Sequence, residues 1–167
     1  LNVAIDGDTA VVGTPDPGPG AAYVFTRANG SWSQQQKLIA SDGAPSDAFG
    51  NSVAINGDTV VIGAPDDDIA GNTNQGSVYV FTLVNGSWTE QQKLTASDGA
   101  AGDKFGRTAA IDGNTVVVRA DWADVGGNVN QGAAYVFVRS NGNWTQQQKL
   151  TASDGAAGDS FGHYVAV

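Results

Sequence analysis

Residues 63–76, GAPDDDIAGNTNQG, hold the densest group of potential ligand atoms in the chain. The three consecutive aspartates Asp66, Asp67 and Asp68 are followed by Asn72 and Asn74. Carboxylate and amide oxygens are the ligands that Ca²⁺ takes, and glycines let a chain bend around an ion. The spacing matches no EF-hand loop. A ligand-binding loop and an Asn/Gly-rich turn held by its own side chains are therefore both open alternatives.

A related segment, DWADVGGNVNQG, lies at 121–132, and a shorter one, DPGPG, at 16–20. Variation in loop length on a repeated scaffold is typical of functional segments. We therefore predict ligand contacts from both long loops, through Asp66, Asp67, Asp68, Asn72, Asn74, Trp122, Asp124, Asn128 and Asn130. The predicted ligands for a calcium ion are Asp66, Asp68, Asn72, Asn74 and Asp124. Trp122 has no counterpart in the other loops, and could stack on a sugar, anchor a protein partner or cover its own loop.

These loops belong to a sequence repeat of 56 residues, which is the spacing of Trp32, Trp88 and Trp144. The phrase SWTEQQKLTASDGAAGDKFG at 87–106 has near copies at 31–50 and 143–162. Such a period indicates one structural unit per repeat. We place the repeats at about 1–48, 49–104 and 105–160, with the start of a fourth at 161–167.

Each repeat contains four segments with the character of β-strands. In the second repeat they cover residues 52–55, 59–64, 77–82 and 88–96. The pairs Asn56-Gly57 and Asn85-Gly86 separate the first from the second segment and the third from the fourth, and each favours a two-residue hairpin. The second segment is continuously apolar, as in a strand covered on both faces, whereas the fourth is polar and predicts a solvated outer edge.

A gradation from a buried strand to a solvent-exposed outer strand is typical of a β-propeller blade. The sequence thus predicts an all-β fold of four-stranded antiparallel blades: three full repeats beginning with a strand at 1–5, plus one extra strand at 163–167. Because a ring needs about 4–8 blades to close, we expect an incomplete ring. The missing blades would come from a longer parent chain or from a homo-oligomer. Leu1 is not expected to be a natural start, since the chain contains no Met.

Composition excludes several classes of function. The net charge of −9 argues against nucleic acid and anionic lipid as partners. Without cysteine there is no disulfide or thiolate site, and no apolar run is long enough to span a membrane. We expect no enzyme activity, because His163 is the only histidine and no serine lies in a nucleophile-elbow pattern. Asn29, Asn85 and Asn143 fit the glycosylation pattern but also lie at turns.

Phe-Gly pairs occur at 49–50, 105–106 and 161–162, and the motif Gly63-Ala64-Pro65 is weakened at 13–15 and lost at 119–121. With these motifs the repeats resemble those of the FG-GAP family, which also form the propellers of integrin α-subunits. The resemblance implies a β-propeller that binds partners, usually outside the cell. Many members carry a calcium loop between the first and second strands. Here that connection is only a tight turn such as Asn56-Gly57-Asp58, which cannot supply the 6–8 oxygens that calcium takes.

Aspartates present in every repeat are interpreted as turn scaffolding, and the repeated aromatic residues as packing. Strand parity puts twelve of the acidic residues at the end of the blades that carries the long loops, and four at the hairpin end. An acidic face attracts cations or basic partners. We therefore expect an extracellular or cell-surface module that binds a protein or carbohydrate ligand. The alternatives are an assembly unit of a surface layer or filament, and the propeller part of a larger secreted enzyme.

Overall fold

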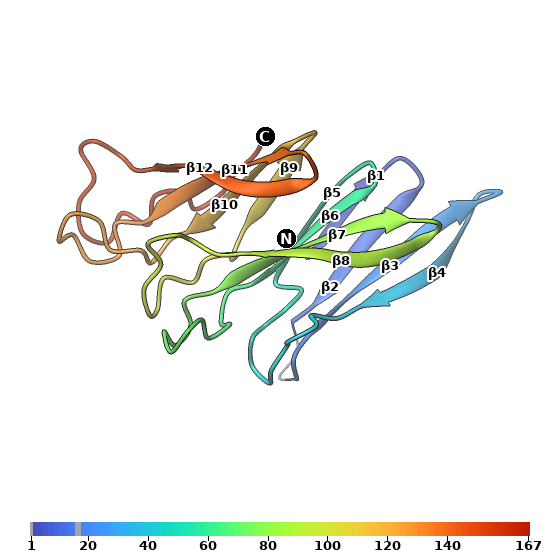
Figure 1. Ribbon diagram of the computed structural model, residues 1–167, viewed down its shortest axis with the longest axis horizontal. Coiled ribbons are helices and arrows are strands. Elements are labelled where there is room, and N and C mark those ends of the chain that lie inside the picture. The colour runs from blue at the N-terminus through green and yellow to red at the C-terminus, as the bar shows by residue number, and fades with distance from the viewer. Residues whose placement is uncertain (1, 16–17) are drawn as a thin grey trace.

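The computed structural model describes residues 2–15 and 18–167, which form three separate four-stranded antiparallel sheets (Figure 1). Each sheet follows chain order, so the predicted four-stranded units are confirmed. Blade 1 consists of β1 (Val3–Asp6), β2 (Thr9–Thr14), β3 (Ala21–Ala28) and β4 (Ser31–Leu38). Blade 2 consists of β5 (Ser52–Asn56), β6 (Thr59–Ala64), β7 (Ser77–Val84) and β8 (Ser87–Leu94). Blade 3 consists of β9 (Ala109–Asp112), β10 (Thr115–Ala120), β11 (Ala133–Ser140) and β12 (Asn143–Leu150).

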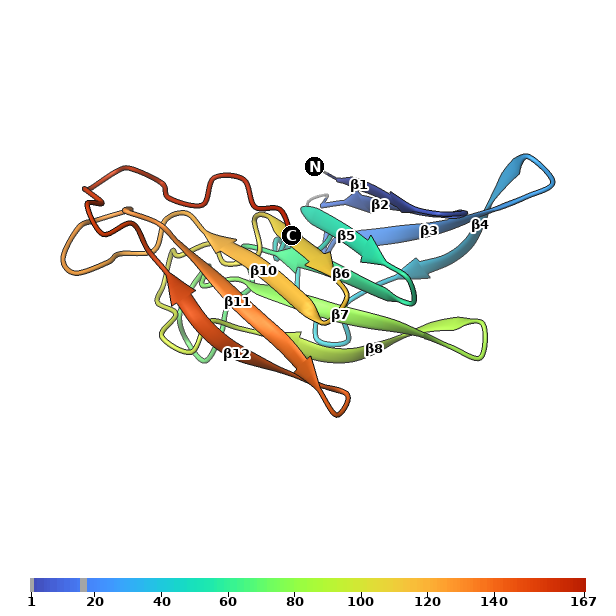
Figure 2. The same cartoon turned by 90° about the horizontal axis from the view of Figure 1, so that it is seen from above.

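The blades lie side by side in chain order, and the described residues do not close a ring (Figure 2). β5 packs against both β1 and β9, so the first strands are neighbours. The long loops and the connectors between blades gather along one side of the molecule, at the lower left of Figure 1, and the hairpins lie at the opposite ends of the strands. The chain segments that were expected to share a face therefore do so, although Leu1 and Asp16 lie outside the described residues. No helix in the described part of the chain is long and apolar enough to cross a membrane.

The two apolar cores lie between blades rather than within them. Alternate side chains of a strand point to opposite faces of the sheet. In β6, Val60 and Ile62 therefore face blade 1, whereas Val61 faces blade 3. The Phe-Gly phenylalanines complete these cores: the ring of Phe49 lies 5.3 Å from that of Tyr79, and the ring of Phe105 lies 5.5 Å from that of Tyr135, both edge to face. We call each interface between neighbouring blades a seam.

The polar fourth strands contribute to the seams, which the sequence did not indicate. Gln36 in β4 donates from Nε2 to the Trp88 carbonyl at 2.7 Å and accepts from the Trp88 N–H at 2.8 Å. Gln92 in β8 clamps Trp144 of blade 3 in the same way. A β-bulge in the pairing of β3 with β4 lets the adjacent Gln35 reach Gly86 of blade 2 as well. The predicted solvated edge is therefore exposed along much of its length but also joins the blades.

The tryptophans show how strongly burial depends on a neighbouring blade. Trp88 and Trp144 are 3% and 2% exposed, because blades 1 and 2 respectively cover them. Trp32 occupies the same place in blade 1 and is 42% exposed, since no blade precedes it among the described residues. The interpretation of these residues as packing is thus correct for two of the three.

Residues 161–167 form no strand, in contrast to the prediction of a strand at 163–167. The corresponding segments of blades 2 and 3 begin with Gly50 and Gly106, where a Cβ would lie 2.3 Å from a carbonyl oxygen of the preceding blade. A Cβ on Gly162 would instead lie 3.5 Å from the equivalent oxygen. Arg119 accounts for the looser fit, because it replaces the glycine of the GAP motif and its Nη1 donates to the His163 carbonyl at 2.6 Å. In addition, the first strands β1, β5 and β9 each pair only with the second strand of the same blade, and no second strand follows residues 161–167 here.

Candidate functional site

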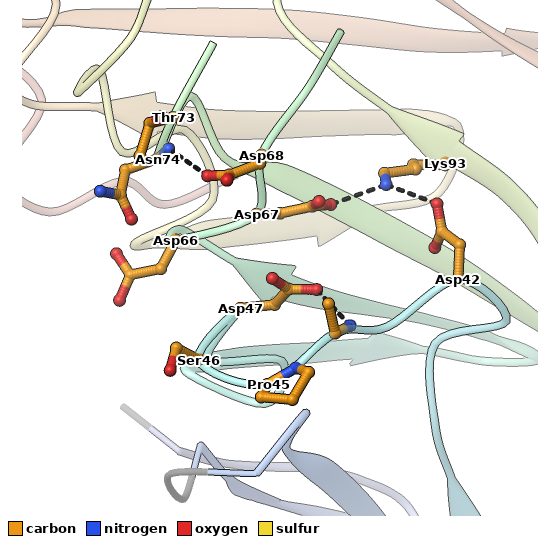
Figure 3. A pocket seen from close by; sticks show the side chains of 11 residues that line it. Asp42, Pro45, Ser46, Asp47, Asp66, Asp67, Asp68, Thr73, Asn74 and Lys93 are labelled. Atoms are coloured by element: carbon orange, nitrogen blue, oxygen red, sulfur yellow. Dashed lines mark hydrogen bonds and ion pairs between the residues drawn. The ribbon is translucent and has the colours of Figure 1, made fainter. Parts of the chain in front are cut away.

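Asp67 lies in the seam between blades 1 and 2 rather than on an open loop (Figure 3). Asp67 is 5% exposed, and its carboxylate accepts hydrogen bonds from the Ser77 hydroxyl at 2.5 Å and the Tyr79 hydroxyl at 3.0 Å. Lys93 Nζ lies 2.7 Å from Asp67 Oδ2 and 2.7 Å from Asp42 Oδ2. Asp42 lies in the connector that follows blade 1, so this cluster of charges joins that connector to blade 2.

Burial and the two aspartate partners have opposite effects on the pKa of Lys93. Burial alone lowers the pKa of a lysine, but the hydrogen bonds to Asp42 and Asp67 outweigh it and hold the pKa of Lys93 above its ordinary value. Burial is also the main reason why the pKa of the Tyr79 hydroxyl is raised. Lys93 therefore stays charged and Tyr79 stays neutral over the physiological range. Asp67 therefore lies beside a positively charged Lys93 throughout this range.

The other two aspartates of the loop have separate partners. Asp66 forms an ion pair with Lys104, which lies near the end of the connector to blade 3. Asp68 Oδ1 accepts from the N–H of Asn74 at 2.7 Å and so fixes the bend of the loop, where Asn74 has a φ of 54°. Asp68 remains exposed to solvent.

The loop amides have structural roles. Asn72 Nδ2 donates to Gln75 Oε1 at 2.9 Å and to the Gly99 carbonyl at 3.3 Å, which ties the loop to the next connector. Asn128 makes the same two contacts with Gln131 and Gly155 in blade 3. This is the alternative in which an Asn/Gly-rich turn is held by its own side chains.

The blade 3 loop repeats this framework without a carboxylate at the position of Asp67, and its own buried carboxylate, Asp121, pairs with Arg119. Asp124 Oδ1 accepts from the Asn130 N–H at 2.8 Å, as Asp68 does from Asn74. Ala123 stands where blade 2 has Asp67, and the hydroxyl of buried Tyr135 has no hydrogen-bond partner among the described residues. Trp122 is 44% exposed, with Lys104 and Arg107 5.8 Å and 5.4 Å from its ring centroid.

A cleft of about 390 Å³ opens beside the Asp67 cluster, between the blade 1 connector and the blade 2 loop (Figure 3). We call it the acidic cleft, because five carboxylates and one ammonium group line it, namely those of Asp42, Asp47, Asp66, Asp67, Asp68 and Lys93. Pro45, Ser46, Thr73 and Asn74 complete its walls. Its charge is therefore strongly negative, and it is open to solvent along the loop face.

The acidic cleft contains two residues that the sequence placed in turns only. Asp47 does have the expected turn role, since it accepts from the Ala44 N–H at 2.6 Å. Burial raises the pKa of its carboxyl group above the ordinary value, against the effect of that hydrogen bond. Asp42 instead pairs with Lys93 of the next blade, 51 residues away. The repetition of Asp42 and Lys93 in every copy was the only available signal of this contact.

The structure brings together some of the predicted site residues and not others. Asp66, Asp67, Asp68 and Asn74 line the acidic cleft, whereas Trp122, Asp124, Asn128 and Asn130 belong to the blade 3 loop outside it. Among the described residues, no three acidic or histidine side chains converge in a way that could hold a metal ion. The calcium site stays a prediction, and most of its proposed ligands already have hydrogen-bond partners within the loops.

Replacing Asp67 with alanine is expected to lower the free energy of unfolding by about 2 kcal/mol, because the Tyr79 hydroxyl loses one of its two acceptors and Ser77 its only one. Lys93 keeps Asp42, and blade 3 folds with Ala123 at this position, so the loss is limited. Urea denaturation measures it. A loss above about 4 kcal/mol, the range of an uncompensated buried charge, would contradict this assignment of partners.

Comparison with known proteins follows the same 56-residue period. A family model described as FG-GAP repeat matches residues 32–81, 88–137 and 144–167. The first two matches run from the fourth strand of one blade across the seam into the third strand of the next. No curated protein sequence matches the chain.

Proposed function

Because the chain belongs to the FG-GAP repeat family, we propose that it is a non-catalytic binding module of an extracellular or cell-surface propeller, and that the acidic cleft binds a basic segment of a protein partner. Repeats of this family are typical of β-propellers that are often extracellular. The observation that carries the proposal is the gathering of five carboxylates in a solvent-open cleft on the loop face, where Lys93 pairs with Asp42 and Asp67, and Lys104 pairs with Asp66.

The negative charge of the acidic cleft is the reason for proposing a cationic ligand. Lys93 is held by Asp42 and Asp67, so it neutralises part of the cluster only, and Asp47 and Asp68 have no cationic partner among the described residues. A lysine or arginine side chain from a partner would supply the missing positive charge and could donate to both carboxylates. A neutral glycan would gain less here, because the loop tryptophan, Trp122, lies outside the cleft and is flanked by cations.

Catalysis is not part of the proposal. His163 lies beside Arg119 at the far end of blade 3, with 3.0 Å between its Nδ1 and Arg119 Nη2, and away from the acidic cleft. The carboxylates of the cleft are engaged with a turn, a lysine or a loop N–H rather than aimed jointly at one reacting atom. Recognition of charge requires only that they remain ionised and accessible.

The test is the affinity for a fluorescein-labelled hexa-arginine peptide, measured by anisotropy at near-physiological salt. Asp68→Asn is expected to weaken binding about fivefold, the effect of one close charge pair. Asp124→Asn is the matched control, because Asp124 makes the same loop hydrogen bond and carries the same charge outside the cleft. The control is expected to change the dissociation constant less than about twofold, as one screened distant charge would.

Equal effects of the two variants would contradict the proposal, since they would mean that the peptide responds to the net charge of −9 and not to the cleft. The pH dependence gives a second readout. Because burial raises the pKa of Asp47, this carboxyl group is expected to take up a proton at higher pH than an ordinary aspartate. Binding of the cation should therefore begin to weaken, as the pH falls, when Asp47 takes up its proton.

A further inference from the structure

The seam between blades 2 and 3 contains a buried hydroxyl group that makes no hydrogen bond. Tyr135 in β11 is fully buried, and its hydroxyl has no partner in the described part of the chain. Burial and the nearby charges of Asp98 and Asp103 raise the pKa of this hydroxyl, so it stays protonated and remains a donor. A buried donor without an acceptor costs free energy, and native proteins seldom leave one unpaired. The Tyr135 hydroxyl therefore marks a position that suits an acceptor.

The seam between blades 1 and 2 shows which acceptor suits this position. Tyr79 is the counterpart of Tyr135, and its hydroxyl donates to Asp67 Oδ2 at 3.0 Å. Lys93 Nζ and the Ser77 hydroxyl contact the same oxygen at 2.7 Å and 2.5 Å. In this seam a carboxylate oxygen is thus held by one ammonium group and two hydroxyl groups.

Blade 3 retains the lysine and the tyrosine but not the acid. Lys149 Nζ lies 2.7 Å from Asp98 Oδ2 and 5.4 Å from the centroid of the Tyr135 ring. The corresponding ion pair and ring distance of Lys93 are 2.7 Å and 5.1 Å. Because Ala123 stands in place of the shared aspartate, Lys149 has one carboxylate partner among the described residues, whereas Lys93 has two.

The substitutions at the centre of this position only remove atoms. Asp67 is replaced by Ala123 and Ser77 by Ala133, so blade 3 lacks one carboxyl group and one hydroxyl group. The backbone does not move in to compensate. The carbonyl of Ala123 accepts from the N–H of Gly132 at 2.9 Å, and the same bond in blade 2 is 3.0 Å long. The framework that holds a carboxylate in blade 2 is therefore present in blade 3 without its carboxylate.

We propose that the position lined by Ala123, Tyr135 and Lys149, here called the Ala123 site, binds the carboxylate group of a small ligand in place of the aspartate that blade 2 supplies. The carboxylate would accept from the Tyr135 hydroxyl and from the Lys149 ammonium group. The site is closed in this structure, where Ala123 is 1% exposed. Lys149 lies over the Tyr135 ring and its side chain is 25% exposed, so rotation of this flexible side chain opens the site.

The acidic surroundings do not exclude a carboxylate. The acids around the Ala123 site are Asp98, Asp103 and Asp124, and each has an acidic counterpart that lines the acidic cleft. Asp67 is buried among those counterparts with Lys93 as its cation, so the same arrangement of charges already holds one further carboxylate. A free carboxylate lacks the covalent tether of Asp67, and is therefore expected to bind weakly.

The test is a titration with sodium formate in place of sodium chloride at constant ionic strength, followed by NMR. We expect saturable shifts at residues 98, 123, 135 and 149, with a dissociation constant of about 1–10 mM, because a ligand of three non-hydrogen atoms cannot bind much more tightly. Tyr135→Phe should weaken binding at least about fivefold, the effect of one hydrogen bond. It should leave the fold intact, since the hydroxyl that it removes has no partner among the described residues.

Tyr79→Phe is the matched control, because the Tyr79 hydroxyl has its acceptors, Asp42 and Asp67, in the other seam. Formate binding at the Ala123 site should not change in this variant. Ala123→Asp supplies the carboxylate from the chain itself, so it should abolish the formate response. Asp67→Ala should create a second site, and formate should then restore part of the urea midpoint that this variant loses.

The peptide acetyl-Gly-Asp-Gly-amide distinguishes the sources of the carboxylate. Binding of formate but not of the peptide would support a small free acid as the ligand, and binding of both would support the site and add the side chain of a protein partner as a source. Two results would overturn the proposal. One is the absence of saturable shifts at the Ala123 site, and the other is a formate response that Tyr135→Phe and Ala123→Asp leave undiminished.

Discussion

Replacing Trp88 with alanine is expected to lower the free energy of unfolding by about 3–5 kcal/mol. Trp88 is 3% exposed in the core between blades 1 and 2, and its indole N–H lies 3.3 Å from Gln35 Oε1. Truncation would leave a cavity against the rigid backbone of two sheets. Urea denaturation gives the value.

The repeat supplies the control for this prediction. Trp32 follows the same Asn-Gly-Ser segment as Trp88, yet 42% of it is exposed and the Arg27 guanidinium stacks 5.4 Å from its ring centroid. Trp32→Ala should cost less than about 1.5 kcal/mol in the monomer. Similar losses at the two positions would show that the tryptophans act within their own blades and that the seams are not where the stability lies.

Replacing Gly63 with alanine is expected to cost about 3 kcal/mol or more. A Cβ at this position would lie 1.9 Å from the carbonyl oxygen of Gly106 and 2.4 Å from Ser52 Oγ. The carbonyl belongs to the backbone that starts blade 3, so no side-chain rotation relieves the clash and the seam must open. The measurement is again the free energy of unfolding in urea.

Gly18→Ala is the matched control, because a Cβ there meets no atom within 4 Å and needs no unusual backbone conformation. Its effect should stay within about 0.5 kcal/mol. Blade 3 has Arg119 at this position, and the following Gly162 lies farther out, with its Cβ 3.5 Å from the Ala133 carbonyl oxygen. A Gly63→Ala protein as stable as the wild type would contradict this explanation.

The sequence was sufficient for the internal structure of a blade. Apolar segments separated by Asn-Gly pairs predicted the four strands, and at the hairpin between β11 and β12 both Asn141 and Gly142 have the positive φ values, 51° and 83°, that such turns require. These features depend on residues that are close together in the chain. The resemblance to FG-GAP repeats rests on the same local motifs.

The seams could not be predicted, because they depend on pairs of residues about one repeat apart. Gln36 and Trp88 are 52 residues apart, as are Gln92 and Trp144. In the sequence, the run of glutamines indicates only a solvent-exposed strand. No local sequence feature predicts that Trp88 is buried and Trp32 is exposed. The difference in their burial comes from the position of each blade in the row.

The candidate site likewise combines features that the local sequence predicts with contacts between distant segments that it does not predict. The acidic loop was recognised as a site because of its composition, but Asp67 turned out to be a buried partner of Lys93 and Tyr79. Asp42 and Asp47 were interpreted as turn residues, and both line the acidic cleft. Their repetition correctly indicated a structural role. It gave no indication that they also line the cleft, because the cleft forms only where two different segments meet at a seam.

The proposed binding at the acidic cleft is tested most directly by an amide NMR titration of the chain with the hexa-arginine peptide. We predict chemical-shift changes that saturate at residues 42–47, at 66–74 and at Lys93, with the loop at 121–130 unchanged. This loop is an internal reference because it carries the same framework, Asp124 with Asn130 and Asn128 with Gln131, outside the cleft. Equal changes in both loops, or none at residues 42–47, would contradict the proposal that the cleft is the binding site.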